Sequence, residues 1–507
     1  MRINMVTRRD VIVGGSAFVG LAGTVFKAQT ATSRIRSEVS TPEGRGMLSR
    51  YREAVKLMRD ETKFPRHDPR SWKFQANIHW VHPEDNSEEA FDAIFSTSGM
   101  SNEQADAVKR HRILAIGTSS AVRTWATCQH TDNVEYFFLG WHRLYLWHFE
   151  RIVASLVGDD FALPYWDYSQ KNSSFGRALP PEFRVAINGS QAGNLLWYEH
   201  RDAKMNKESN PAELEESDVT STVAFKADGL YKPGDMSGFS RSLNNAPHGN
   251  VHGAIGGSGI DAGMGSVPTA ARDPIFWIHH CSIDRLWEMW RRSSKGKSDE
   301  GSFRSDWENV SFAFADRNGE RTEMAVLKSL DLPYLEYDYD TVPLVEEVIT
   351  TLDIQSSRKV MIAEMGKGES ITVVGTGAVV DLATTPDLMT VGAVEISDAS
   401  IELEIRATEE PSTSFNVFVK FPAQAALEQK EVAVGRFNVF GASTKNQPGG
   451  AQFLVTLDAA SVLPELKIRG IEKLELRVSP VKGETTIPIK IDSVRILVKQ
   501  RQKGELK

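Results

Sequence analysis

Four histidines in the middle of the chain have the types and the spacing of a metal site. His248 and His252 are four residues apart, so on a helix both imidazoles project from the same face. His279 and His280 follow in a second amphipathic run. Two helices can direct such donors at one ion, and a site built from imidazole alone favours copper or zinc. The stretch 244–290 therefore predicts a metal centre.

A second histidine cluster lies upstream, in CQHTDNVEYFFLGWHRLYLWHFERI, and contributes His130 and His142. Either cluster alone could be a set of packed core histidines, and their combination argues against that. Together the two histidine clusters resemble the CuA and CuB motifs of the tyrosinase, catechol oxidase and mollusc-type haemocyanin family. The matching runs include FALPYWDYS, PHGNVH, and DPIFWIHH before SIDRLW. The resemblance spans Gln75 to Trp290 and implies a type-3 site with two copper ions.

The resemblance assigns three imidazoles to each copper ion. The CuA motif matches His79, His130 and His142, and the CuB motif matches His248, His252 and His280. His82 is close enough to His79 in sequence to be the alternative ligand. The interval from His130 to His142 is longer than the family's usual one, which indicates an insertion. Adjacent helical side chains point about 100° apart, so His279 is expected behind the ligands.

Further residues are expected around the copper ions. Cys128, in a C-x-H pattern, matches a cysteine that some relatives join to the histidine ring through a thioether; a small buried cysteine is the alternative. Asp284, one turn after the last CuB histidine, either orients imidazoles or forms a structural pair with Arg285. Val267 matches a position that overhangs the copper pocket in relatives, and its small size implies an open approach.

The resemblance implies an enzyme that uses dioxygen to oxidise o-diphenols to o-quinones. Relatives that also hydroxylate monophenols often carry a glutamate a few residues before the first CuB histidine and an asparagine just after it, which hold a water. Asn244 and Gly249 stand at these positions, so we expect weak or absent monophenol hydroxylation. The alternatives are a tyrosinase with full monophenolase activity, an o-aminophenol oxidase and a haemocyanin-like oxygen carrier. The single copper unit favours an enzyme over a carrier.

Composition narrows the remaining classes. The 507 residues are 41% hydrophobic and 25% charged, as in an ordinary soluble globular protein. The formal net charge of −8 gives no support for binding nucleic acid or an anionic membrane surface. Two cysteines, Cys128 and Cys281, cannot build a disulfide framework. The expected partners are dioxygen and a phenolic small molecule, with no stable membrane insertion; a need for a copper chaperone is open.

The order of segments predicts an exported protein with two large parts. Residues 1–31 resemble a twin-arginine (Tat) export signal, because Arg8 and Arg9 precede an uncharged run too short for a typical membrane span. A plain secretory signal or an uncleaved anchor is the alternative. The location is therefore expected to be periplasmic or secreted. A mainly α-helical copper domain, with a four-helix core around two coppers, is expected over 41–340, followed by a linker over 341–366.

Alternating apolar runs dominate the rest of the chain. ESITVVG, IELEIRA, FNVFVKF and several similar runs predict an all-β antiparallel sandwich over 367–507. FNVFVKF resembles a pattern in the C-terminal domains of plant and bacterial polyphenol oxidases, where the domain covers the copper entrance or stabilises the enzyme. An aromatic or leucine side chain could plug the pocket, and the sequence does not identify it.

Overall fold

The computed structural model describes residues 34–116, 124–128, 136–169, 175–190, 193–231, 238–299, 307–343, 357–384, 396–424, 427–442, 450–469 and 473–501. Residues 33–507 form one compact unit. The expected export signal at 1–31 lies outside the described residues. Within these ranges, no helix combines the length and the apolar character needed to span a membrane.

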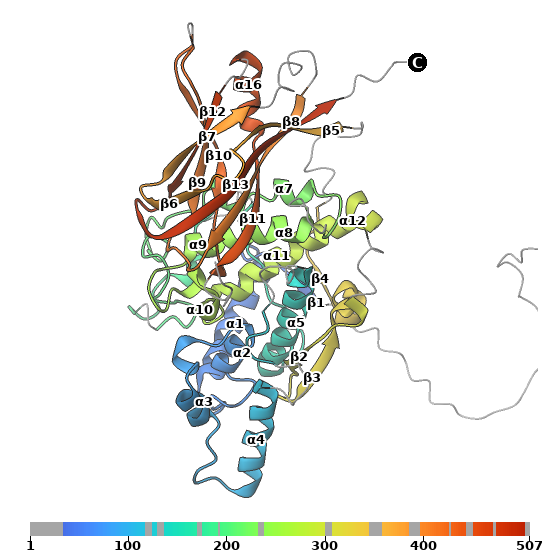
Figure 1. The fold of residues 1–507 in the computed structure, drawn as a ribbon. Coiled ribbons are helices and arrows are strands. Elements are labelled where there is room, and N and C mark those ends of the chain that lie inside the picture. The colour runs from blue at the N-terminus through green and yellow to red at the C-terminus, as the bar shows by residue number, and fades with distance from the viewer. Residues whose placement is uncertain are drawn as a thin grey trace, which may run out of the picture. The chain divides into compact units, whose positions relative to one another are not determined.

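The part that carries the copper motifs is mainly helical (Figure 1). Its helices are α1 (Pro42–Arg59), α2 (Trp72–His79), α3 (Glu88–Ile94), α4 (Asn102–Ile116), α5 (Phe138–Val157), α6 (Glu216–Val219), α7 (Thr222–Phe225), α8 (Phe239–Leu243), α9 (Asn250–Ile255), α10 (Val267–Ala270), α11 (Ile275–Arg292), α12 (Ser294–Asp299) and α14 (Leu332–Leu335). Shorter helical turns are η1 (Pro83–Asp85), η3 (Pro181–Phe183), η4 (Asn244–Gly249), η5 (Gly263–Gly265) and η6 (Val326–Leu330). Strands β1 (Arg34–Arg36) and β4 (Tyr337–Tyr339) pair in parallel, and β2 (Ser311–Ala315) pairs with β3 (Arg321–Ala325) in antiparallel fashion.

Helices α5 and α11 form the centre of this part because nearly all their side chains are buried. Phe149 of α5 stacks on Trp277 of α11, with ring centroids 3.4 Å apart. Helix α1 packs its apolar face on α5 and is capped by Thr41, whose side chain accepts a hydrogen bond from the Gly44 amide. The other histidine-bearing helices, α2 and α9, have only 8 and 6 residues, so the expected four-helix core stays a prediction.

A buried ionic cluster joins the two ends of the helical part. The Asp284 carboxylate accepts hydrogen bonds from Arg36 at 3.1 Å, from the Tyr337 hydroxyl at 2.6 Å and from Arg143. Arg36 also donates to Glu150 at 2.9 Å. Buried charges need such pairing, because a lone ion loses its hydration. Of the two roles expected for Asp284, these bonds fit a structural pairing with arginine. Its partners are Arg36 and Arg143, whereas the expected partner is Arg285.

The C-terminal part is a nine-stranded antiparallel sheet. Its strands are β5 (Ser357–Glu364), β6 (Ile371–Gly375), β7 (Ala378–Thr384), β8 (Ile396–Ala407), β9 (Phe415–Phe421), β10 (Lys430–Phe437), β11 (Ala451–Asp458), β12 (Lys473–Pro480) and β13 (Thr485–Arg501), and its short helices are η9 (Ala460–Val462) and α16 (Leu463–Arg469). The strand order is β10-β9-β12-β7-β5-β13-β8-β11, with β6 also paired to β13.

Hydrogen bonds join these strands in one sheet, whereas the sequence predicts the two separate sheets of a sandwich. The difference comes from β13, whose 17 residues pair with β8 on one side and with both β5 and β6 on the other. Strands β10 and β11, at the two ends of the order, contact each other, so the sheet curls around a single apolar core. Strand β5 lies inside the expected linker 341–366, so the sheet begins before residue 367.

Ion pairs connect the sheet to the short helices before the CuB motif. The Lys226 ammonium lies 3.1 Å from the carboxylate of Asp398, near the start of β8. It also lies 3.0 Å from the carboxylate of Asp458, at the end of β11. Arg436 of β10 lies 2.7 Å from Asp218 of α6. These partly buried pairs hold the turn after β10 near α9.

Candidate metal centre

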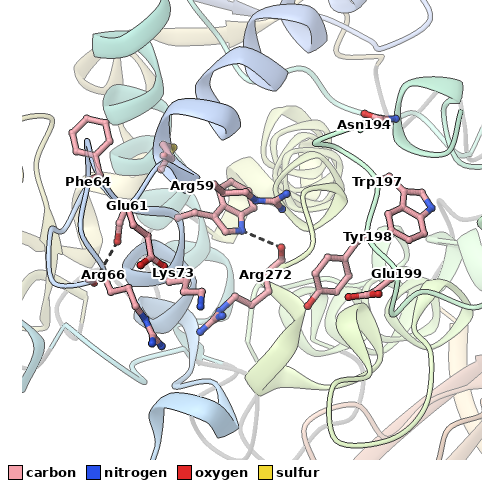
Figure 2. Close-up of a pocket in the computed structure, with 13 residues that line it drawn as sticks. Arg59, Glu61, Phe64, Arg66, Lys73, Asn194, Trp197, Tyr198, Glu199 and Arg272 are labelled. Atoms are coloured by element: carbon pink, nitrogen blue, oxygen red, sulfur yellow. Dashed lines mark hydrogen bonds between the residues drawn. The ribbon is translucent and has the colours of Figure 1, made fainter. Parts of the chain in front are cut away.

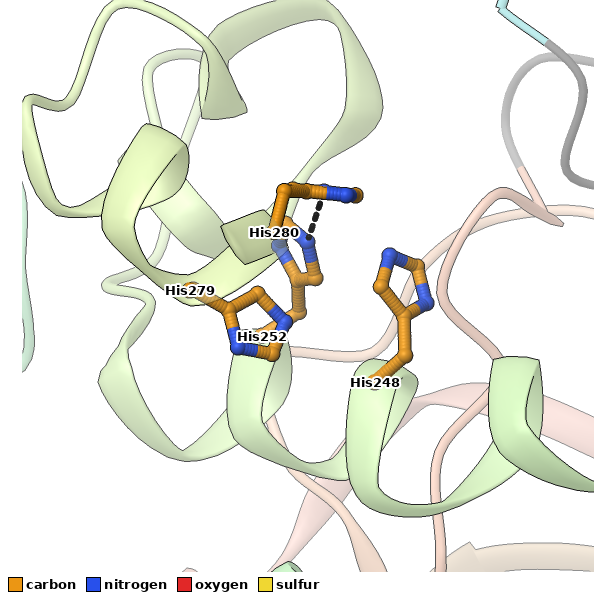
Figure 3. A group of neighbouring side chains, drawn as sticks. All are labelled: His248, His252, His279 and His280. Atoms are coloured by element: carbon orange, nitrogen blue, oxygen red, sulfur yellow. Dashed lines mark hydrogen bonds between the residues drawn. The ribbon is translucent and has the colours of Figure 1, made fainter. Parts of the chain in front are cut away.

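Four imidazoles gather where α9 meets α11. His248 and His252 lie on neighbouring turns across η4 and α9, beside His279 and His280 of α11 (Figure 3). One ligand atom from each residue lies within 4.8 Å of those of the others. The ring centroids of His248 and His252 are 4.6 Å apart, and His252 Nε2 lies 3.4 Å from His280 Nε2. The structure thus brings the residues matched by the CuB motif together in one buried group.

A second buried group consists of His79, Cys128 and His142. His79 is the last residue of α2, and His142 lies in the first turns of α5. Cys128 Sγ lies 3.4 Å from His142 Nε2. His130 lies outside the described residues, so its copper ligation and its thioether bond to Cys128 stay predictions.

The two groups adjoin. The rings of His142 and His280 stack with centroids 4.5 Å apart and planes 7° apart. The ring centroids of His142 and His248 are 6.3 Å apart, and those of His79 and His280 are 6.4 Å apart. Two ions held by these groups would therefore be close neighbours, as in two-metal sites generally.

Backbone carbonyls orient four of the imidazoles. In each case Nδ1 lies within hydrogen-bond distance of a carbonyl oxygen. The pairs are His79 with Val267 at 3.1 Å, His142 with Phe138 at 2.7 Å, His248 with Asn244 at 3.1 Å and His252 with Met264 at 2.7 Å. An Nδ1–H that donates to a carbonyl leaves the Nε2 lone pair to a metal ion and fixes the ring in place. The Val267 and Asn244 backbones therefore position predicted ligands.

Burial keeps these imidazoles neutral. It lowers the pKa of His142 and of His252 from 6.5 to about 3. Burial, with neighbouring imidazoles adding to it, also holds the pKa of His79 and His280 well below the ordinary value. Metal ions bind the neutral imidazole, so near pH 7 no proton opposes ligation. A buried, nitrogen-rich donor set that includes no carboxylate among the described residues fits a pair of copper ions.

His279 and His280 are both near the CuB group, and their contacts differ. His279 Nδ1 lies 3.3 Å from the Tyr168 hydroxyl, and its Nε2 has no hydrogen-bond partner within the described residues. The His280 ring stacks on His142 and its Nε2 faces His252, which places it between the two groups. These contacts favour His280 as the ligand and His279 behind it.

His82, the alternative to His79, points to a different part of the structure. The Glu84 amide donates to its Nδ1 at 3.2 Å, and its Nε2 lies 3.3 Å from an Asp261 carboxylate oxygen. Nδ1 as acceptor places the ring proton on Nε2, where it can be donated to Asp261. The structure therefore favours His79 for the CuA group.

An aromatic side chain from the C-terminal sheet reaches the CuB group. Phe440, in the turn after β10, stacks on the His252 ring with centroids 4.1 Å apart and planes 20° apart, and its ring centroid is 5.7 Å from that of His248. Gly441 follows with φ of 92°, a conformation that favours glycine. A Cβ added at Gly249 would lie 3.9 Å from Phe440 Cβ, an ordinary van der Waals contact, so Gly249 and Phe440 are neighbours.

Comparison with known sequences identifies the central part of the chain. A family model described as the common central domain of tyrosinase matches residues 69–293. The tyrosinase HcTyr1 of Hahella sp. (strain CCB-MM4) is 35% identical over 237 residues, which are 42% of this chain and 48% of that protein. The chloroplastic polyphenol oxidase of Vitis vinifera is 27% identical over 327 residues, or 59% and 46% of the two chains. The chain spans about half the length of the curated relatives it matches.

Solved structures share the fold over nearly the whole chain. Latent apple tyrosinase has a TM-score of 0.58 and 19% identity, covering 92% of this chain and 97% of its own. A functional unit of octopus hemocyanin has a TM-score of 0.50 and 15% identity, covering 92% and 99%. The helical core and the β-rich C-terminal region are therefore a tyrosinase-like fold. The central part of the chain, residues 69–293, therefore belongs to the tyrosinase family of type-3 copper proteins, and both histidine groups lie within it.

Proposed function

We propose that the protein is a dicopper phenol oxidase that uses dioxygen to oxidise o-diphenols to o-quinones. In this reaction two diphenols each give up two electrons and two protons, and one dioxygen becomes two waters. The observation that carries the proposal is the meeting of two buried imidazole groups through the stacked rings of His142 and His280. Relatives named tyrosinase and polyphenol oxidase support the same chemistry.

The copper pair would supply the electron transfer between phenol and dioxygen. The chain's own residues keep the imidazoles neutral and oriented, and aromatic rings surround them. The Phe138 ring centroid lies 4.8 Å from that of His248, and the Phe276 centroid lies 4.3 Å from that of His280. Both phenylalanines are fully buried. Such an apolar wall excludes water and suits the flat ring of a phenol.

Monophenol hydroxylation is proposed to be weak, because it needs a group that removes the phenol proton. Neither histidine group includes a carboxylate among the described residues. Gly249 has no side chain that could help to hold a water, and the Asn244 carbonyl lies within hydrogen-bond distance of His248 Nδ1. The site therefore favours o-diphenols, which need no hydroxylation before they are oxidised.

We further propose that Phe440 keeps the enzyme latent. Its ring lies on the His252 imidazole, where an incoming phenol ring would otherwise stack. Latent apple tyrosinase, which shares the fold, is by its name a latent form. Export through a Tat-like signal, and a copper-delivering partner that meets the folded chain, are proposals that rest on residues 1–31 alone.

The test is oxygen uptake by the copper-loaded full-length protein, before and after mild proteolysis, with catechol, L-DOPA, tyrosine, tyramine and 2-aminophenol. We expect turnover of catechol and L-DOPA after cleavage of the C-terminal part, and little uptake with tyrosine or tyramine. Turnover of 2-aminophenol in preference to catechol would instead indicate an o-aminophenol oxidase. Reversible oxygen binding with no turnover of any substrate would refute the enzyme and favour an oxygen carrier. A His252→Ala variant is the control for copper-dependent uptake.

A further inference from the structure

A cavity outside the metal centre lies between the end of α1, the start of α2 and the segment 194–199 (Figure 2). Its volume is about 390 Å³, enough for a small aromatic molecule. None of the residues of the two histidine groups lines it. The proposed oxidase chemistry therefore leaves this cavity without a role.

One side of the cavity is cationic. Figure 2 shows the charged ends of Arg66, Lys73 and Arg272 gathered together. They share the carboxylates of Glu84 and Asp85: Lys73 lies 3.0 Å from Glu84, Arg272 lies 2.8 Å from Glu84 and 2.6 Å from Asp85, and Arg66 contacts Asp85. Each of these three cationic groups has more N–H donors than its contacts with Glu84 and Asp85 use.

The same side has hydrogen-bond donors without acceptors. Arg272 is 7% exposed, and its buried Nε–H has no hydrogen-bond partner among the described residues. The Nε–H of Arg66 is also buried and without an acceptor in the described part of the chain. A buried donor left unpaired costs about 1–3 kcal/mol. A ligand that brings acceptor oxygens would remove this penalty once either guanidinium turns to expose its Nε–H to the cavity.

The other side of the cavity is aromatic. Trp197 and Tyr198 face the cationic cluster across the cavity in Figure 2. Trp72 forms another wall, with the Arg59 guanidinium 5.1 Å from its ring centroid. Burial lowers the pKa of Arg59, and its described hydrogen bond goes to the Leu195 carbonyl instead of a carboxylate. Stacking and cation–π contacts both favour a flat ring here.

From this arrangement we infer a binding site for a small aromatic carboxylate. Its ring lies against the aromatic side, and its carboxylate accepts hydrogen bonds from Arg66, Lys73 and Arg272 as a charge-assisted acceptor. Glu61 and Glu199 also line the cavity and are exposed, which disfavours a polyanion. The site is separate from the oxidase reaction and does not depend on it.

The site is tested by calorimetric titration of the copper-loaded full-length protein with cinnamate, which has no phenolic hydroxyl to oxidise. We expect saturable binding that is about tenfold weaker for neutral methyl cinnamate. Lys73→Met and Trp197→Leu should each weaken cinnamate binding about tenfold. Lys56→Met, which removes the same charge from an exposed position on α1, should leave it unchanged.

Three outcomes would overturn the inference. The first is equal binding of cinnamate and its methyl ester, which would mean that no carboxylate is recognised. The second is an affinity unaffected by both Lys73→Met and Trp197→Leu. The third is binding lost in a copper-depleted His252→Ala variant, which would place cinnamate on the metal instead of in this cavity. Thermal melting of each variant separates lost binding from lost folding.

Discussion

Replacing Phe440 with alanine should activate the full-length enzyme without proteolysis. The Phe440 ring is 6% exposed and stacks on His252, so a phenol can reach that imidazole face only after the ring has moved out. Returning a buried phenylalanine to water costs about 1.5–3 kcal/mol. Losing an aromatic stack costs about 0.5–1.5 kcal/mol more. The open state is therefore about 2–4.5 kcal/mol above the closed one.

This penalty lowers the apparent affinity for substrate by the fraction of open molecules. With a factor of ten for each 1.36 kcal/mol, kcat/KM should rise about 30- to 2,000-fold in Phe440→Ala. The assay is oxygen consumption with catechol by copper-loaded protein at matched copper content. The maximal rate on proteolysed protein should change little, because the substitution removes a barrier to entering the site and leaves the imidazoles in place.

Phe418→Ala is the matched control. Phe418 is a half-buried phenylalanine of β9, packed against Arg477, with its guanidinium carbon 4.0 Å from the ring centroid. It belongs to the same sheet and has no described contact with the histidine groups. The reasoning is refuted if Phe440→Ala and the wild type have equal kcat/KM, or if Phe418→Ala activates equally, since general loosening of the sheet would then explain the effect.

Four further predictions follow from the same structure. His280→Asn should lose about one copper per chain and His279→Asn should retain both, as measured by elemental analysis; the reverse result would make His279 the ligand. Gly249→Asn should raise oxygen uptake on tyramine by the proteolysed enzyme; unchanged tyramine uptake would show that the amide does not help to hold a water. Burial lowers the pKa of His148 to about 3, so below pH 6.5 the unfolded chain binds a proton that the folded chain does not, and stability falls by about 1.4 kcal/mol per pH unit. In urea unfolding of the metal-free chain, the free energy of unfolding of His148→Phe relative to the wild type should therefore rise by about 2 kcal/mol from pH 6.5 to pH 5. A difference between the two proteins that does not change with pH would contradict this. Asp284→Asn should lower the free energy of unfolding by about 3–5 kcal/mol, because two buried arginines lose a shared carboxylate, and a loss below about 1 kcal/mol would be evidence against that network.

The histidine groups could be predicted from the sequence because their signal is local. The spacing of His248 and His252 fixes a shared helix face, and the adjacent motifs resemble a known family. The choice between His79 and His82 is not local. Helix α2 ends at His79, and the chain then turns so that His82 meets Asp261. The direction of His82 depends on where that helix ends, and sequence patterns place helix ends poorly.

Long-range contacts account for what the sequence did not reveal. Asp284 lies one turn after His280, yet its carboxylate bonds to Arg36, which is 248 positions away in sequence. Alternation in the C-terminal runs predicts which side chains of a strand are buried, and leaves open which strands pair. The long strand β13 has partners on both sides. It therefore joins in one sheet the strands that the sequence predicts to form the two layers of a sandwich. Phe440 lies in a turn with no periodic pattern, and only the packing of the sheet on α9 brings it to His252.

The residue after the first CuB histidine links the two functional properties proposed for this chain. Gly249 cannot help to hold the water that an asparagine would hold, which disfavours monophenol hydroxylation. Gly249 also lies beside the plug, since a Cβ at residue 249 would be 3.9 Å from the Phe440 Cβ, an ordinary van der Waals contact. Substitutions at Gly249 therefore test both proposals together, because this residue adjoins the first CuB histidine and the plug.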